Sequence, residues 1–132
     1  MTQANLEVVF DHLDARRSRD LARLESQFDP DVVHQGVLPE LVCNNRDEVL
    51  ANVRHGFARD DFGVDHLEMI DAGDQVVVGL AGPRFREVPW APLSGQVYIV
   101  YTIRDGRIVR MHDFLTRKEA ITAAGGAAHD WA

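Results

Sequence analysis

The sequence predicts an α+β domain in which helices come first and a mainly antiparallel sheet follows. An amphipathic helical stripe opens the chain, and strand-like runs separated by turns fill its second half. The strongest local signal is Asp105-Gly106, which separates the runs Gln96–Arg104 and 107–115. Asp-Gly between such runs is typical of a hairpin, because a type I′ turn needs a positive φ at both central residues.

Composition restricts the class of function. The 132 residues suit one domain with an apolar core, and a net charge of −7 argues against nucleic acid or an anionic membrane as partner. Cys43 is the only cysteine and the histidines are dispersed, so we expect neither a disulfide nor a metal site. No signal segment or membrane-length apolar run is present, which predicts a cytoplasmic protein.

Two helices are expected before the first strand. Ser18 could cap the second helix, Pro30 ends it, and residues 31–36 read as a short strand. The first helix, residues 5–17, has the i, i+3, i+4, i+7 spacing of a buried stripe, formed by Leu6, Val9, Phe10 and Leu13.

The remaining elements follow from caps and turns. Asn45 with Glu48 forms a capping box that predicts a helix over residues 46–57, and Thr116 with Glu119 predicts a short last helix. Strands are expected at residues 64–70 and Gln75–Ala81. A loop with three prolines, residues 82–94, joins the latter to the hairpin, and residues 125–132 read as a flexible tail.

Three segments resemble a known family: Phe-x-Pro-Asp-Val-Val at 28–33, Asn-Arg-Asp-Glu at 45–48, and DGRIVRMHDFLTRKEA at 105–120. Through them the chain resembles the nuclear transport factor 2-like superfamily, in its SnoaL-like branch, over nearly its whole length. The resemblance implies one domain, residues 1–132, with the cone-shaped, cystatin-like fold. Its curved sheet and helices enclose a pocket.

The resemblance places Asp113 inside the cone, where limonene epoxide hydrolase has a catalytic carboxylate. Strand alternation then puts Val109 and Met111 inside with it, and Arg110 and His112 outside. On the preceding strand the side chains expected to face inward are Val97, Ile99, Tyr101 and Ile103.

The strand Gln75–Ala81 completes the expected pocket and an expected interface. Small side chains would face inward and leave room for a ligand: Val77, Gly79 and Ala81. An apolar row would then face outward and predict a homodimer through the outer sheet face; it comprises Val76, Val78, Leu80, Tyr98 and Val100.

Two specific enzymes of the superfamily do not match. Limonene epoxide hydrolase has an arginine and an aspartate where this chain has Ala81 and Pro83. The positions that ketosteroid isomerase uses carry Gln35, an apolar residue near Val9, and Ile99 or its neighbour. The looser SnoaL-like pattern remains, in which a pocket carboxylate and a histidine act on a carbonyl compound.

The candidate catalytic residues are therefore Asp113, His34 and Tyr101, and each has a structural alternative. Asp113 could serve the N-terminus of the last helix, His34 could hydrogen-bond a loop backbone, and Tyr101 could be a core residue with a tethered hydroxyl. The expected substrate-binding residues are Trp90, Met111, Ile99, Val53 and Phe57.

Two functions remain open. The first is a cofactor-independent isomerase, cyclase or lyase that acts on a small apolar or aromatic carbonyl compound. The second is a non-catalytic ligand-binding or dimeric assembly protein. Cys43 reads as a small hydrophobe. His55 reads as a solvated helix residue, and exposure is also expected for His12, His66 and His112.

Overall fold

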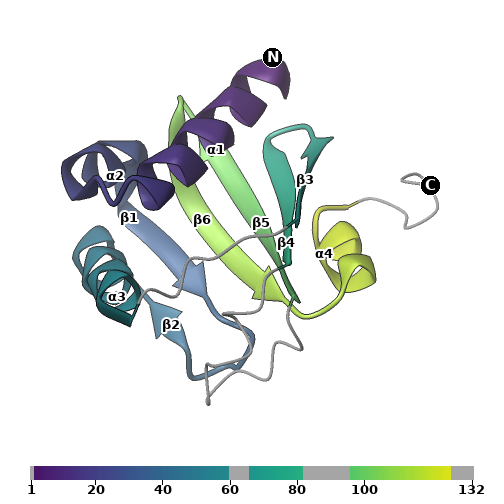
Figure 1. Ribbon diagram of the computed structural model, residues 1–132. Coiled ribbons are helices and arrows are strands. Elements are labelled where there is room, and N and C mark those ends of the chain that lie inside the picture. Colours follow the sequence, from purple (N-terminus) through teal and green to yellow (C-terminus); the bar gives the residue numbers. More distant parts are fainter. Residues whose placement is uncertain (1, 60–65, 82–95, 126–132) are drawn as a thin grey trace.

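A computed structural model describes residues 2–59, 66–81 and 96–125. Four helices and six strands occur in these ranges (Figure 1). They follow the chain in the order α1 (Thr2–Arg17), α2 (Leu21–Gln27), β1 (Phe28–Gln35), β2 (Val42–Cys43), α3 (Arg46–Arg59), β3 (His66–Ala72), β4 (Gln75–Ala81), β5 (Gln96–Arg104), β6 (Arg107–Phe114) and α4 (Arg117–Ala123).

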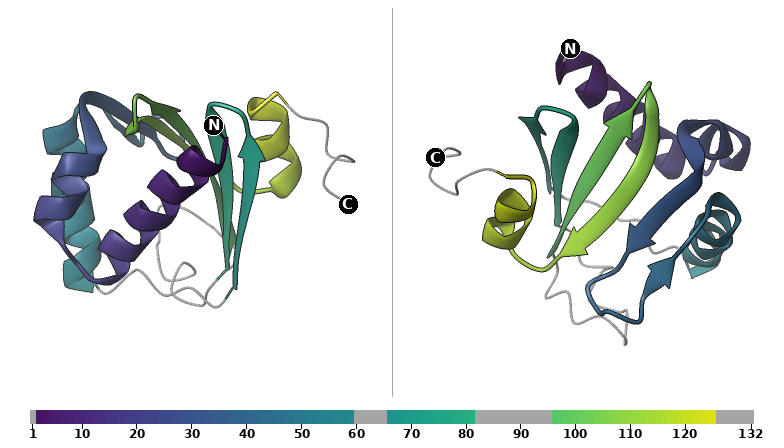
Figure 2. Two further views of the ribbon diagram at one scale, coloured as in Figure 1. Left: turned by 90° about the horizontal axis from the view of Figure 1, so that it is seen from above. Right: turned by 180° about the vertical axis from the view of Figure 1, so that it is seen from behind.

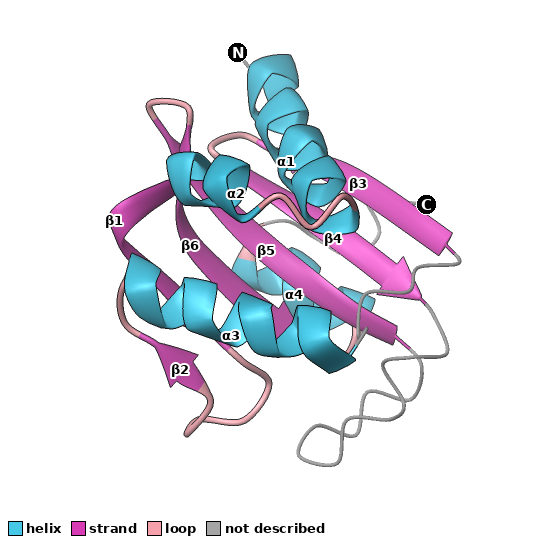
Figure 3. Ribbon diagram, turned by 60° about the vertical axis from the view of Figure 1, so that its left-hand side comes forward, coloured by secondary structure: helices cyan, strands magenta, loops and turns pink. Residues whose placement is uncertain are grey.

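All six strands form one sheet in the order β2-β1-β6-β5-β4-β3. The meander from β3 to β6 is antiparallel as expected, and β1 extends it by pairing parallel to β6. The sheet is curved, with α1, α2 and α3 on its concave side and α4 on its other side (Figures 2 and 3). The predicted α+β cone is confirmed, with a sheet that is mixed.

The hairpin between β5 and β6 has the predicted turn. Asp105 and Gly106 both have positive φ, of 53° and 77°, as a type I′ turn requires. Nothing lies within 4 Å of a Cβ built on Gly106, so backbone conformation alone selects glycine there.

Both predicted N-caps, Asn45 and Thr116, form. Asn45 Oδ1 accepts a hydrogen bond of 2.9 Å from the Glu48 amide, and Glu48 Oε1 accepts one of 2.8 Å from the Asn44 amide. Thr116 Oγ1 accepts from the Glu119 amide at 3.2 Å. The bonds from the Glu48 and Glu119 amides satisfy donors that the first turn of a helix leaves free, so α3 and α4 begin where predicted.

The start of α2 differs from the expectation. Asp20 caps it, since Asp20 Oδ1 accepts from the Arg23 amide at 3.1 Å. The expected cap, Ser18, instead donates its hydroxyl to the Asp14 carbonyl at 2.6 Å and so ends α1. The buried stripe of α1 also differs, because Phe10 is 61% exposed whereas His12 is fully buried.

The main apolar core fills the concave side of the sheet. It is formed by Val9, Leu13, Ala15, Leu24, Phe28, Val32, Val49, Leu50, Val53, Val76, Val78, Leu80, Val97, Tyr101, Ile103, Ile108 and Met111. A smaller cluster lies beneath α4 on the outer side, where Ala120 packs with Val77 and Val100. The helix α4 therefore covers part of the outer face within the chain itself.

The expected faces of β4 were wrong. Val76, Val78 and Leu80 lie in the inner core, and Val77 lies outside. The reason is register, because Val78 pairs with Ile99 and directly paired residues share a face. Gly79 pairs with Tyr98 on the outer side, so it leaves no room in the interior, and a Cβ there would lie 2.7 Å from the Tyr98 ring.

The expected inward position of Val109 was also wrong. Thr102 pairs with Arg110 but the next residue, Ile103, pairs with Ile108, so Val109 is the extra residue of a β-bulge. The bulge shifts the alternation by one residue. Ile108 therefore enters the core, and Met111 keeps the expected inward position.

Candidate functional site

The centre of the candidate site is a hydrogen bond between His34 and Asp113. His34 Nε2 lies 2.9 Å from Asp113 Oδ1. The two side chains are 15% and 20% exposed, so they are shielded but not sealed from solvent. Parallel pairing of β1 with β6, which sets His34 beside Met111, brings the two residues together. Such a pair can share or transfer a proton.

This bond bears on the structural alternatives for both residues. Thr116, and not Asp113, supplies the N-cap of α4. The Asp113 side chain is instead hydrogen-bonded to the side chain of His34. Asp113 pairs with Ile99 across β5, which gives the carboxylate an apolar neighbour on one side. The site thus combines one polar pair with an apolar strand surface.

Tyr101 lies on β5 in the same core and is fully buried. Its hydroxyl has no hydrogen-bond partner among the described residues. Burial raises the pKa of Tyr101, an effect that the positive charge of Arg16 opposes and the charge of Asp113 reinforces. The phenol therefore stays protonated at neutral pH and can donate a hydrogen bond.

His12 is a further polar residue of this interior, and the expectation that it is exposed was wrong. Its ring packs edge to face against Phe28, with centroids 5.3 Å apart, and against Tyr101 at 5.4 Å. Burial and the charge of Arg16 lower the pKa of His12 well below 6.5. An interaction with the Gln27 side chain raises the pKa of His12 and so opposes this effect. Within the described part of the chain, neither ring nitrogen of His12 is placed to form a hydrogen bond with good geometry.

The sequence did contain a signal for His12. Counting from Val9 by the same helical spacing gives His12, Leu13 and Arg16, and this stripe competes with the one through Phe10. The stripe through Phe10 is the more apolar of the two, so the prediction left His12 outside the buried face. In the structure, α1 packs on the sheet with the stripe through His12.

The expected substrate-binding residues fall into two groups. Met111 and Val53 are buried in the concave core, and Ile99 is partly buried against it. Trp90, the loop of residues 82–94, the Phe57 side chain and the His66 side chain lie outside what the structure describes.

Cys43 and His112 lie near the pair but differ from it. Cys43 pairs with His34 across β1 and β2, and its thiol pKa is raised by burial and by the charges of Glu48 and Asp113, which disfavours a nucleophilic thiolate. His112, expected to be exposed, is partly buried on the outer face and stacks on Phe114 with centroids 4.3 Å apart.

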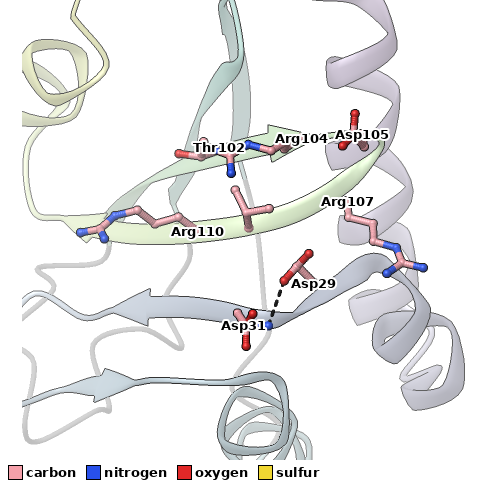
Figure 4. Close-up of a pocket in the computed structure, with 8 residues that line it drawn as sticks. Asp29, Asp31, Thr102, Arg104, Asp105, Arg107 and Arg110 are labelled. Atoms are coloured by element: carbon pink, nitrogen blue, oxygen red, sulfur yellow. Dashed lines mark hydrogen bonds between the residues drawn. The ribbon is translucent and has the colours of Figure 1, made fainter.

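The outer face carries a groove of about 780 Å³ (Figure 4). It is lined by Asp29, Asp31, Thr102, Arg104, Asp105, Arg107, Val109 and Arg110. Both acidic and basic side chains line it, and none of the predicted catalytic residues is among them. Among the described residues there is no cluster of three metal-ligating side chains and no helix long and apolar enough to cross a membrane.

The sequence matches the model of the SnoaL-like domain family over residues 9–111. The chain therefore belongs to the SnoaL-like family. A search of curated proteins found no significant match.

Solved structures support the same fold. A candidate polyketide cyclase from Sinorhizobium meliloti is 23% identical with a TM-score of 0.67, covering 82% of this chain and 94% of that one. An NTF2-like protein from Burkholderia xenovorans is 12% identical with a TM-score of 0.65, covering 86% and 90%. TerC, crystallised with polyporic acid, is 20% identical with a TM-score of 0.61, covering 93% and 99%. Such identities establish the fold and leave the reaction open.

Proposed function

We propose that this SnoaL-like protein is a cofactor-independent enzyme that performs acid–base chemistry on a small apolar carbonyl compound. The observation that carries the proposal is the 2.9 Å hydrogen bond between His34 and Asp113 on the concave side of the sheet. A carboxyl group paired with an imidazole offers both a proton acceptor and a proton donor. Isomerisation, cyclisation and dehydration all use this combination.

The proposed reaction begins with removal of a proton from the carbon beside the carbonyl group. Asp113 takes that proton, and the C–H electron pair becomes the enolate. Tyr101 or His34 donates a hydrogen bond to the carbonyl oxygen as negative charge develops on it. Asp113 then returns the proton to another carbon in an isomerisation. In a lyase reaction the enolate electrons form a C=C bond as the bond from the β-carbon to the leaving group breaks, and Asp113 gives the proton to that leaving group.

The proposed ligand is apolar or aromatic. Apolar side chains surround the polar pair, including Met111 and the partly buried Ile99. TerC, a structural neighbour, was crystallised with polyporic acid, and another neighbour is a candidate polyketide cyclase. These likenesses support a polyketide-like carbonyl compound as the class to test first.

The test uses Asp113→Asn, which keeps the shape of the side chain and removes the proton acceptor. A panel of small cyclic ketones and 1,3-diketones is incubated in D₂O, and exchange of the α-protons is followed by NMR. We expect the wild type to accelerate exchange of at least one compound, and the variant to lose this by ~10²-fold or more while staying folded. An unchanged rate, or a variant that unfolds, would refute the catalytic proposal.

A second candidate function is ligand binding without catalysis. It is favoured by the low exposure of both side chains, because a hydrogen bond between two shielded polar groups also stabilises a fold. In that case ligands bind, no compound exchanges protons faster, and Asp113→Asn lowers stability without a kinetic effect.

We also propose a cytoplasmic homodimer formed through the outer sheet face. Partly buried apolar side chains remain there beside α4, namely Tyr98, Phe114 and Ile70. Sedimentation that shows a monomer at micromolar concentration would exclude this assembly.

A further inference from the structure

Three buried polar atoms beneath α1 lack hydrogen bonds. They are both ring nitrogens of His12 and the hydroxyl of Tyr101, and neither side chain is exposed to solvent. Buried polar groups in native proteins are nearly always paired, because an unpaired one loses its hydration without compensation. Two such residues in ring contact therefore indicate a position where a further polar group binds.

Tyr101 and His34 both pair with Met111, from the two strands that flank β6, so these atoms are near the His34–Asp113 pair. The charge of His34 acts on the pKa of His12, and the charge of Asp113 acts on that of Tyr101. Arg16 is close enough to act on both His12 and Tyr101. The interior therefore has one end that can transfer protons and a neighbouring end that can only bind.

We propose that His12 and Tyr101 together bind one oxygen atom of the ligand, and that this oxygen is attached to an sp² carbon, as in an enol, a phenol or an enolisable ketone. The inference rests on the proposed function, to which it adds His12 and a ligand class. His12 N–H and Tyr101 O–H supply two donors, which match the two lone pairs of one such oxygen.

The charges of the site favour this class over a carboxylate. His12 is neutral because burial and Arg16 lower its pKa, and Tyr101 is also neutral. Two neutral donors would leave half of the lone pairs of a carboxylate unsatisfied inside an apolar core. A single oxygen is fully satisfied, and the nearby charge of Arg16 favours the enolate that proton transfer creates.

His12 and Tyr101 are both fully buried, so a ligand reaches them by displacing side chains. No hydrogen bond fixes the His12 ring, which is held by edge-to-face contacts with Phe28 and Tyr101. The ring can therefore turn without the loss of a hydrogen bond. The alternative is that His12 is satisfied by Gln27, whose Oε1 is also buried and unpaired.

The test compares 1-naphthol with naphthalene, which differ only in a hydroxyl on an sp² carbon. Binding is measured by calorimetry for the wild type, His12→Phe and Tyr101→Phe. The matched control is His55→Phe, the same change at an exposed histidine of α3. We expect the wild type and the control to prefer 1-naphthol by about tenfold or more, the worth of one net hydrogen bond.

Each interior variant should lose most of that preference while its affinity for naphthalene stays within about threefold of the wild type. A wild-type preference that survives in His12→Phe would overturn the assignment of His12 and favour its pairing with Gln27. Equal wild-type affinity for the two probes, or no binding of either, would overturn the ligand class. The proposed reaction is judged separately, because it fails only if Asp113→Asn leaves α-proton exchange unchanged or does not fold.

Discussion

His34 Nε2 lies 2.9 Å from Asp113 Oδ1 although the two residues are 79 positions apart in the chain. The parallel pairing of β1 with β6 creates this contact. Parallel strands cannot be joined by a tight turn and need a long connection. The contact between His34 and Asp113 therefore depends on how the chain between β1 and β6 folds.

The first prediction concerns the energy of this pair. A double-mutant cycle with His34→Ala and Asp113→Ala should give a coupling energy of about 1 kcal/mol in the free energy of unfolding, the usual net value of one hydrogen bond. Urea unfolding at pH 7 measures it. The control cycle combines His34→Ala with Asp31→Ala, an exposed residue of the same strand, and should be additive. Additivity in both cycles would contradict the prediction.

The second prediction concerns acid stability. The folded state holds His12 neutral, with its pKa far below the value of 6.5 expected in the unfolded chain. The stability of a fold that keeps His12 neutral is fully present above pH 6.5. It is lost as the pH falls below 6.5, because His12 then binds a proton in the unfolded chain but not in the folded chain. The loss approaches about 1.4 kcal/mol per pH unit.

His12→Phe should remove this dependence. The free energy of unfolding is measured for the wild type and for His12→Phe at pH 7.5, 6.5 and 5.5. The difference between the two proteins at each pH reports on His12, because the other titrating groups are present in both. The charges of Arg16 and His34 add to the cost of a charge on the His12 ring, whereas Gln27 reduces it. Parallel curves for the two proteins would show that His12 is not buried in solution.

Local signals in the sequence predicted local structure well. The Asp105-Gly106 turn and the caps at Asn45 and Thr116 depend on residues one to three positions apart, and all three formed. The superfamily resemblance added the overall architecture, which the comparisons confirm.

The faces of strands were harder to predict. Alternation divides β4 into two sets of side chains but does not say which set faces inward, and pairing of Val78 with Ile99 decides it. The bulge at Val109 arises from a shift between two strands and is likewise absent from local sequence. Asp113 and His34 were each candidates, yet their direct contact depends on the parallel pairing that no short motif encodes.

The third prediction concerns the hairpin turn. Gly106 has φ of 77° with open space around its Cβ position, so Gly106→Ala should cost about 1 kcal/mol through backbone strain alone. Asp105→Asn is the matched control, because asparagine tolerates positive φ as well as aspartate does. Thermal unfolding of the two variants measures the difference. Equal stabilities would mean that the turn changes type.

The last prediction concerns Val78, once expected to lie on an outer dimer surface. The side chain is fully buried in the concave core. Val78→Asp would place a carboxylate there without a charge partner, at a cost of several kcal/mol against a total stability of about 5–15 kcal/mol. The variant should therefore fail to fold, rather than form a folded monomer. Val42→Asp makes the same change on β2 at a residue that is 39% exposed and should stay folded. Circular dichroism and sedimentation of both variants distinguish the outcomes, since a folded, monomeric Val78→Asp would place this residue on the surface and reverse the faces of β4.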